Sequence, residues 1–103
     1  AKWGVIGLSK SLAIELGEYG VRVNAVLPGV VSGKRQEKIL KSKAAARNIS
    51  YEEVEAEALS FASIKQYVSP LDIAKQIVFL ASDSGKMISG QAISVCGDLK
   101  MLS

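Results

Sequence analysis

Histidine is absent from the 103 residues, and cysteine occurs once, at Cys96. Without histidine, the chain cannot by itself form a serine–histidine–aspartate triad or a histidine metal site. We predict no metal centre. A single cysteine cannot form an internal disulfide, which fits a reducing compartment, and we expect a cytoplasmic protein.

Long hydrophobic runs are also missing. Hydrophobic residues make up 49% of the sequence, but they come in short runs that cannot cross a bilayer, and no stretch has the basic start and apolar core of a signal peptide. We therefore expect no membrane partner. The formal net charge of +3 is too small to identify a partner.

Apolar residues recur at three- and four-residue steps over residues 2–16, which predicts an amphipathic helix. No capping residue precedes this helix, so we expect a preceding segment of chain. Residues 21–27 form a short β-branched run that predicts a buried strand, and Pro28-Gly29 stops it. A last short strand is predicted over residues 91–95.

The stretch between these strands is helical in composition. It is first basic and then acidic, and we predict a helix break near Asn48 and a new helix from Tyr51. Ser50 followed by Glu53 is typical of a capping box. Ser69 and the proline after it predict the start of another helix, which ends near residue 82.

Two apolar strands joined by a long helical crossover indicate a parallel pair. The predicted fold class is α/β, the C-terminal portion of a Rossmann-like doubly wound parallel sheet: its last two strands with helices and a helical lid. Two strands do not make such a sheet stable alone, so we expect further strands from elsewhere.

Two segments carry a specific resemblance. "AKWGVIGLSKSLAIELGEYGVRVNAVLPG" resembles the catalytic-lysine helix, the next strand and the Pro-Gly turn of the short-chain dehydrogenase/reductase family. "SPLDIAKQIVFLASDSGKMISGQAISVCG" resembles its last helix and strand. Each motif is weak alone, but their order and spacing are specific. The resemblance implies that residues 1–103 are the C-terminal part of one dehydrogenase domain, with residues 34–67 as a helical substrate-lid insertion.

The family resemblance implies an NAD(P)-dependent oxidoreductase that transfers hydride between nicotinamide and a carbonyl or alcohol, such as a 3-oxoacyl thioester, a sugar or a polyol. Lys2 matches the catalytic lysine. The family's tyrosine lies four positions earlier, ahead of Ala1. A phenol has a pKa of about 10, and a nearby ammonium lowers it. Lys2 is also implied to bind the nicotinamide ribose.

Cofactor binding, to NAD or NADP, is further implied at the turn after the first strand: Pro28, Gly29, Val30 and Val31. Gly29 would let the backbone approach a flat ring. Many family members have threonine at the position of Gly33, so a phosphate contact there is in doubt. The Gly-rich phosphate loop is absent; "GVIGLSKSLAIELG" only imitates one within a helix.

Several other residues have expected roles. The lid resemblance suggests that Phe61, Ile64 and Tyr67 line the substrate pocket. Cys96, where the family often has aspartate, is expected to serve packing rather than nucleophilic chemistry. Asn24 is expected to support structure.

Assembly is suggested by the first helix, which is apolar on more than one side. We predict a homotetramer, with a dimer as the runner-up, and expect Trp3 in the core or a subunit contact. Leu12 is taken as an outward position on this helix.

Two alternatives remain open. The chain could be a catalytically inactive scaffold, which the presence or absence of the upstream tyrosine would decide. It could instead be a basic nucleic-acid module. The basic run from Lys34 is interleaved with Glu37 and lacks aromatic residues, so a solvated helix face and no nucleic-acid partner are favoured.

Overall fold

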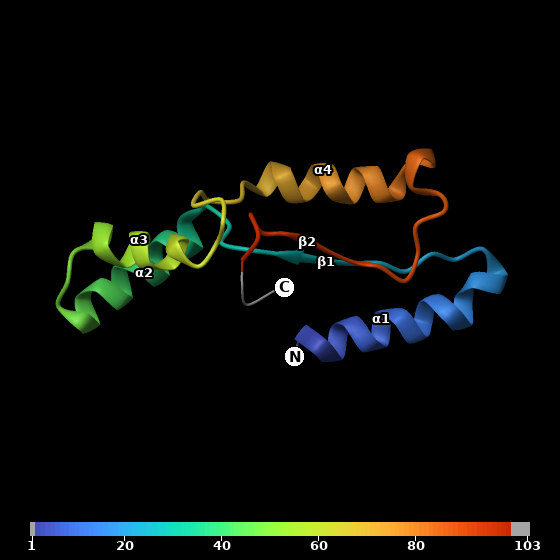
Figure 1. The fold of residues 1–103 in the computed structure, drawn as a ribbon, viewed down its shortest axis with the longest axis horizontal. Helices are drawn as coiled ribbons and strands as arrows, with labels where there is room; N and C mark the ends of the chain where they lie inside the picture. The colour runs from blue at the N-terminus through green and yellow to red at the C-terminus, as the bar shows by residue number, and fades with distance from the viewer. Residues whose placement is uncertain (1, 100–103) are drawn as a thin grey trace.

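The computed structural model describes residues 2–99. These residues extend 55 Å along the longest axis and 25 and 23 Å across it (Figure 1). The elements follow in the order α1 (Lys2–Leu16), the 3-10 turn η1 (Gly17–Tyr19), β1 (Ala25–Pro28), α2 (Lys34–Arg47), α3 (Tyr51–Ser60), α4 (Pro70–Ala81), the 3-10 turn η2 (Asp83–Gly85) and β2 (Ala92–Val95).

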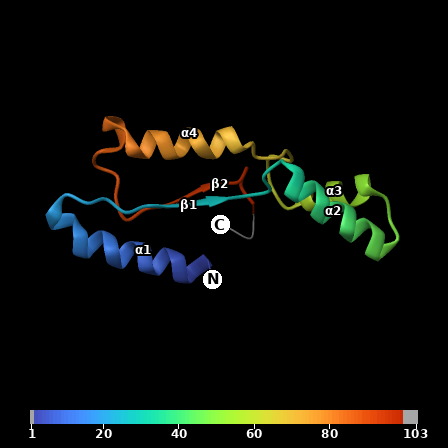
Figure 2. The ribbon, with the colours of Figure 1, turned by 180° about the vertical axis from the view of Figure 1, so that it is seen from behind.

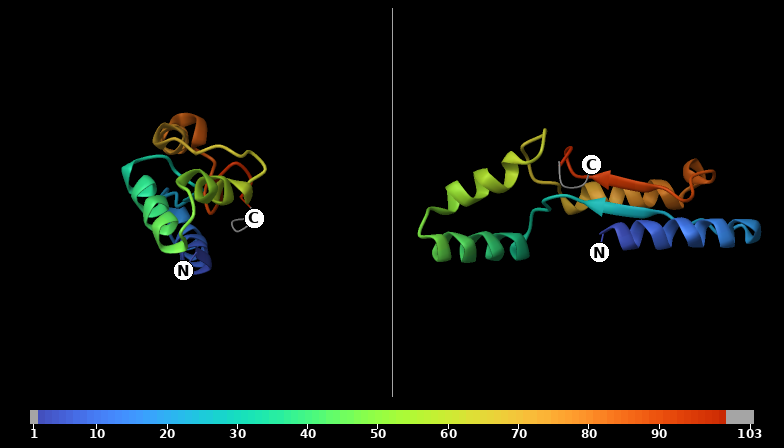
Figure 3. Two further views of the ribbon diagram at one scale, coloured as in Figure 1. Left: turned by 90° about the vertical axis from the view of Figure 1, so that its left-hand side faces the viewer. Right: turned by 60° about the horizontal axis from the view of Figure 1, so that its bottom comes forward.

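The two strands form a parallel pair, as predicted, with Ala25 opposite Ala92 and Pro28 opposite Val95. Helix α4 lies on one side of the pair and helix α1 on the other, as the front and end-on views show (Figures 1 and 3). Helices on both faces of a parallel sheet are the arrangement of a doubly wound α/β fold, which confirms the predicted fold class.

The predicted first strand is wrong at its start, because pairing begins at Ala25 rather than at residue 21. The residues before it bind the loop ahead of β2 instead of a strand. The Val23 amide donates to the Ser89 hydroxyl at 3.1 Å, and the Val23 carbonyl accepts from the Gly90 amide at 2.7 Å. The last strand also begins one residue later than predicted, at Ala92.

Asn24 joins the same two segments through its side chain. Its amide nitrogen donates to the Ile88 carbonyl at 2.9 Å, and its amide oxygen accepts from the Gln91 amide at 3.1 Å. These bonds align the start of β2 with the start of β1. The expected structural role of Asn24 is therefore confirmed.

Helix ends follow the local signals. Asn48, with a left-handed φ of 54°, caps the C-terminal end of α2. At the start of α3 the Ser50 hydroxyl accepts the Glu53 amide at 3.1 Å. The Glu53 carboxylate binds the Ser50 hydroxyl rather than its amide, so only half of that capping box forms. Both halves form between Ser69 and Asp72 at the start of α4.

Helices α2 and α3 lie beyond the carboxyl ends of the strands (Figures 1 and 2). They contact each other through a small core of Leu40, Ala44 and Val54, against which Tyr67 also packs. This pair of helices lies within the predicted insertion, residues 34–67, whose last seven residues are not helical. Its core is separate from the contacts that α1 and α4 make with β1.

The helices beside the strands expose much of their apolar surface. No residue of α1 is buried. Leu8 is 63% exposed and Trp3 70%, so Trp3 does not lie in a core of the described residues. Leu12 is half-buried, so its expected outward position is wrong. Within residues 2–99, no helix combines the length and the apolar character that a bilayer crossing requires.

Truncation of Leu40 should destabilise the insertion. Its side chain is 1% exposed, so Leu40→Ala should lower the free energy of unfolding by about 2–5 kcal/mol in chemical denaturation. Ile39→Ala is the matched control, because Ile39 is adjacent on the same helix and 38% exposed. An equal loss in both variants would contradict the core assignment.

Candidate active site

The chain leaves the sheet directly after β1. The Gly29 amide donates to the Val95 carbonyl at 3.0 Å, which continues the pairing beyond Pro28 by one bond. This turn lies at the carboxyl ends of both parallel strands. Open α/β sheets bind their ligands at that edge, so the turn predicted from sequence stands where a ligand site is expected.

Gly29 lies against the backbone of the other strand end. A Cβ atom at Gly29 would be 2.7 Å from the Cys96 Cα atom and 2.8 Å from its Cβ atom. Glycine is required here because the two strand ends approach so closely. Cys96 is half-buried, and its sulfur accepts the Leu99 amide at 3.3 Å, consistent with the expected packing role.

The residues after Gly29 pair with a distant segment. The Val68 amide donates to the Val30 carbonyl at 2.8 Å, and the Ser32 amide donates to the Val68 carbonyl at 2.9 Å. Val31 forms an isolated parallel bridge with Val68. In such a bridge the bonds run to the residues on either side of Val31, so its own amide and carbonyl face away from Val68.

A cavity of about 380 Å³ opens at this turn. Its lining residues come from the turn and the first two turns of α2: Gly29, Val31, Ser32, Gly33, Arg35, Gln36 and Ile39. Gly33 has a φ of 149°, which side-chain-bearing residues rarely adopt. Glycine at the family's threonine position is therefore matched to the local backbone.

Lys2 belongs to the first turn of α1 and is half-buried. Its ammonium nitrogen lies 4.8 Å from the centroid of the Trp3 ring, a cation–π contact. Helix α1 runs opposite to β1, so its N-terminal end lies at the same edge as the strand ends (Figures 1 and 3). Lys2 begins this helix and does not line the cavity beside Gly29.

The expected lid residues separate into two groups. Phe61 and Ile64 are 47% and 58% exposed. The Tyr67 hydroxyl donates to the Glu55 carboxylate at 2.5 Å, and burial together with this bond raises the pKa of Tyr67. Tyr67 also lines a second cavity, of about 330 Å³, with Ser32 and Gly33. Of the three residues, Tyr67 therefore borders the turn.

Sequence reasoning missed Arg35, Gln36 and Ile39 as lining residues of the turn cavity. They lie in the first two turns of α2. The start of a helix directly after Gly33 was the sequence signal that could have identified them.

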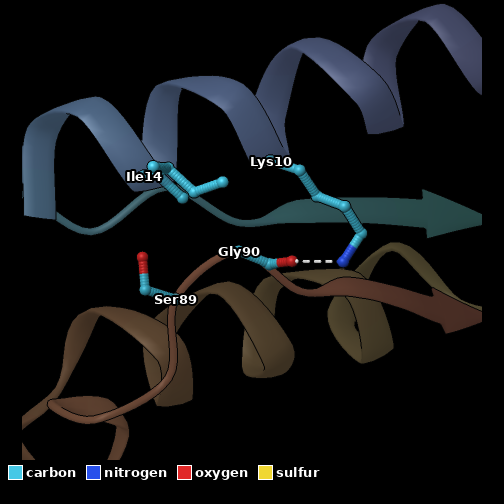
Figure 4. Close-up of a pocket in the computed structure, with 5 residues that line it drawn as sticks. Lys10, Ile14, Ser89 and Gly90 are labelled. Carbon is cyan, nitrogen blue, oxygen red and sulfur yellow. Dashed lines mark hydrogen bonds between the residues drawn. The ribbon is translucent and has the colours of Figure 1, made fainter.

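A further cavity, of about 270 Å³, lies between α1 and the segment before β2. Figure 4 shows Ile14 and Lys10 there, with the Lys10 ammonium donating to the Gly90 carbonyl at 2.9 Å. Because Gly90 precedes β2, this cavity lies at the amino edge of the sheet, away from the turn.

Comparison with known proteins relates this chain to a family of reductases. A family model described as Enoyl-(Acyl carrier protein) reductase matches residues 1–98. The 3-oxoacyl-[acyl-carrier-protein] reductase of Staphylococcus epidermidis is 36% identical over 100 residues, which cover 97% of this chain and 36% of that protein. The curated relatives that come first in similarity are likewise covered over 36–38% of their length.

Solved structures agree with this relationship. A short-chain dehydrogenase family protein from Francisella tularensis superposes with a TM-score of 0.89 at 29% identity, covering 97% of this chain and 41% of that one. An L-sorbose reductase from Gluconobacter frateurii, in complex with NADPH and L-sorbose, superposes with a TM-score of 0.84 at 27% identity, covering 95% and 38%. The chain belongs to the short-chain dehydrogenase/reductase family.

An added methyl group at the turn should disturb the strand ends. Gly29→Ala brings a Cβ atom against the Cys96 backbone, which cannot move aside as a flexible side chain would. We expect a loss of about 1–3 kcal/mol in the free energy of unfolding, measured by chemical denaturation. Gly7→Ala is the control, because nothing lies within 4 Å of an added Cβ there, and it should be neutral or stabilising.

Proposed function

We propose that the protein containing this chain is an NAD(P)-dependent oxidoreductase that transfers hydride between nicotinamide and a carbonyl or alcohol. The observation that carries this proposal is the turn at the carboxyl edge of a parallel pair. There Val31 has backbone groups directed away from Val68, beside a cavity of about 380 Å³. The known chemistry of the relatives, a 3-oxoacyl reductase and a sugar reductase, supports it.

The backbone of the turn supports this proposal. Val31 offers one donor and one acceptor, the pair that a carboxamide requires, and Gly29 keeps the turn against the end of β2. We propose that Pro28 to Val31 hold the nicotinamide end of NAD or NADP. The bound cofactor would supply or accept the hydride, and the chain's own residues would orient its ring.

Lys2 is proposed as the catalytic lysine. Its ammonium would lower the pKa of a tyrosine phenol held nearby and so ease proton transfer to or from the substrate oxygen. It would also donate hydrogen bonds to the ribose hydroxyls of the cofactor. The N-terminal end of α1 at the carboxyl edge of the strands supports this role.

Residues 34–67 are proposed as the substrate lid. Helices α2 and α3 project beyond the edge that carries the turn, and Tyr67 borders Ser32 and Gly33 there. A 3-oxoacyl thioester and a sugar or polyol are the substrate classes to test first, because relatives act on both.

A substrate panel tests the proposed activity. The protein should oxidise NADPH or NADH, followed by absorbance, when it is supplied with 3-oxoacyl thioesters or keto sugars. Binding of reduced cofactor without turnover of any carbonyl would support the alternative, a catalytically inactive scaffold.

Removal of the Lys2 ammonium should slow the reaction. We expect Lys2→Ala to reduce turnover by about 10²-fold or more, because assistance to proton transfer is lost. Lys10→Ala is the matched control on the same helix, since Lys10 binds Gly90 at the other edge of the sheet. Near-normal turnover of Lys2→Ala with intact cofactor binding would remove Lys2 from the mechanism.

We propose a homotetramer as the assembly, with a dimer as the runner-up, in which apolar residues of α1 that the expected further strands leave exposed contact another subunit. Leu8 is the test position, because Leu12 is half-buried. Leu8→Lys should dissociate the assembly before it unfolds the subunit, as measured by light scattering and thermal melting. Ser11→Lys, at an exposed polar position, should leave it intact. A stable, active wild-type monomer at micromolar concentration would contradict the assembly.

A further inference from the structure

Helices α2 and α3 of the helical insertion are joined to the sheet by two short stems. The first stem is residues 30–33, between β1 and α2, and the second is residues 61–69, between α3 and α4. The stems bind each other where Val68 lies between Val30 and Ser32. Those bonds keep the two stems side by side.

A second attachment ties the insertion to the other strand. After β2 the chain turns and pairs antiparallel with the second stem, with Leu99 opposite Ala62. The Ile64 amide donates to the Gly97 carbonyl at 2.9 Å, and the Ser63 amide donates to the Asp98 carbonyl at 3.1 Å. The second stem is therefore held by the segment that follows β2.

One side-chain bond strengthens this attachment. The Ser63 hydroxyl donates to the Asp98 carboxylate. Asp98 has a φ of 63°, and aspartate is one of the few residue types that tolerate this left-handed conformation. Bonds to a charged acceptor are stronger than neutral ones. The pair therefore links the insertion to the end of the strand that lies beside the Pro28-Gly29 turn.

We propose that Ser63 and Asp98 are positioning residues that hold the insertion over the carboxyl edge of the sheet in its substrate-binding position. This inference rests on the proposed function. Loss of the side-chain bond weakens the attachment of the second stem, which then depends on the backbone bonds of Ser63 and Ile64. The turn stays in place, because Gly29 and Ser32 are held by Val95 and Val68. Substrate binding should therefore weaken while cofactor binding is unchanged.

Steady-state kinetics of the complete protein test the pair. Ser63→Ala and Asp98→Gly each remove one partner, and glycine suits the φ of 63° at position 98. We expect the substrate KM to rise about 3- to 10-fold in both variants, the size of one lost charge-assisted hydrogen bond near the surface, with kcat and cofactor Kd unchanged. The double variant should add little to either single one.

Two further variants separate the bond from general effects of substitution. Ser60→Ala is the matched control, because the Ser60 hydroxyl binds the Glu57 carbonyl of its own helix at 2.6 Å. Ser63→Thr keeps the hydroxyl and should restore the wild-type KM. An unchanged KM in Ser63→Ala, or an equal rise in Ser60→Ala, would overturn the proposal.

Hydrogen exchange provides a readout that does not depend on turnover. The amides of Ser63 and Ile64 should exchange faster in Ser63→Ala than in the wild-type protein or Ser60→Ala. A wild-type protein that reduces no carbonyl would overturn the proposed function, and the exchange of these two amides would then decide the positioning role. Unchanged exchange in Ser63→Ala would overturn it.

Discussion

The close approach of the two strand ends, at Gly29 and Cys96, is the contact on which the candidate site depends. A Cβ atom at Gly29 would be 2.7 Å from the Cys96 Cα atom, so no side chain fits between the strands. The chain therefore stays in contact with β2 as it leaves β1. The residues directly after Gly29 then pair with Val68. Backbone packing, rather than side-chain chemistry, gives the turn its shape.

Local signals predicted the helices well and the strands less well. The start of α4 was predictable because Ser69 and Pro70 act within a few residues of their own position. The end of the helical segment that runs through α1 and η1 was predictable too, because Gly20 stops it with a left-handed φ of 76°. The start of β1 was not, because Val23 and Asn24 find their partners in residues 88–91, more than sixty positions away. Strand propensity does not report where such partners lie.

In the candidate site, too, the features set by local sequence were predictable and the contacts between distant segments were not. Pro28-Gly29 could be recognised from sequence as a strand-ending turn, and the family resemblance gave Lys2 its expected role. The contact of Gly29 with Cys96 and the Ser63–Asp98 bond each join segments far apart in sequence, so no local pattern reveals them. On α1, Leu8 and Leu12 could not be told apart, because the helix is apolar on several sides and periodicity then does not define one inward face.

The pairing of Val31 with Val68 also has an evolutionary consequence. It brings together the two ends of the segment that contains α2 and α3, so this segment is a loop that leaves the sheet and returns to it at one place. The free-energy cost of closing such a loop, which is entropic, rises by only about 0.6 kcal/mol for each doubling of its length. Residues can therefore be gained or lost between these ends without shifting the β1–β2 register. This arrangement allows the length of the α2–α3 segment to change while the backbone pairing beside it stays in place.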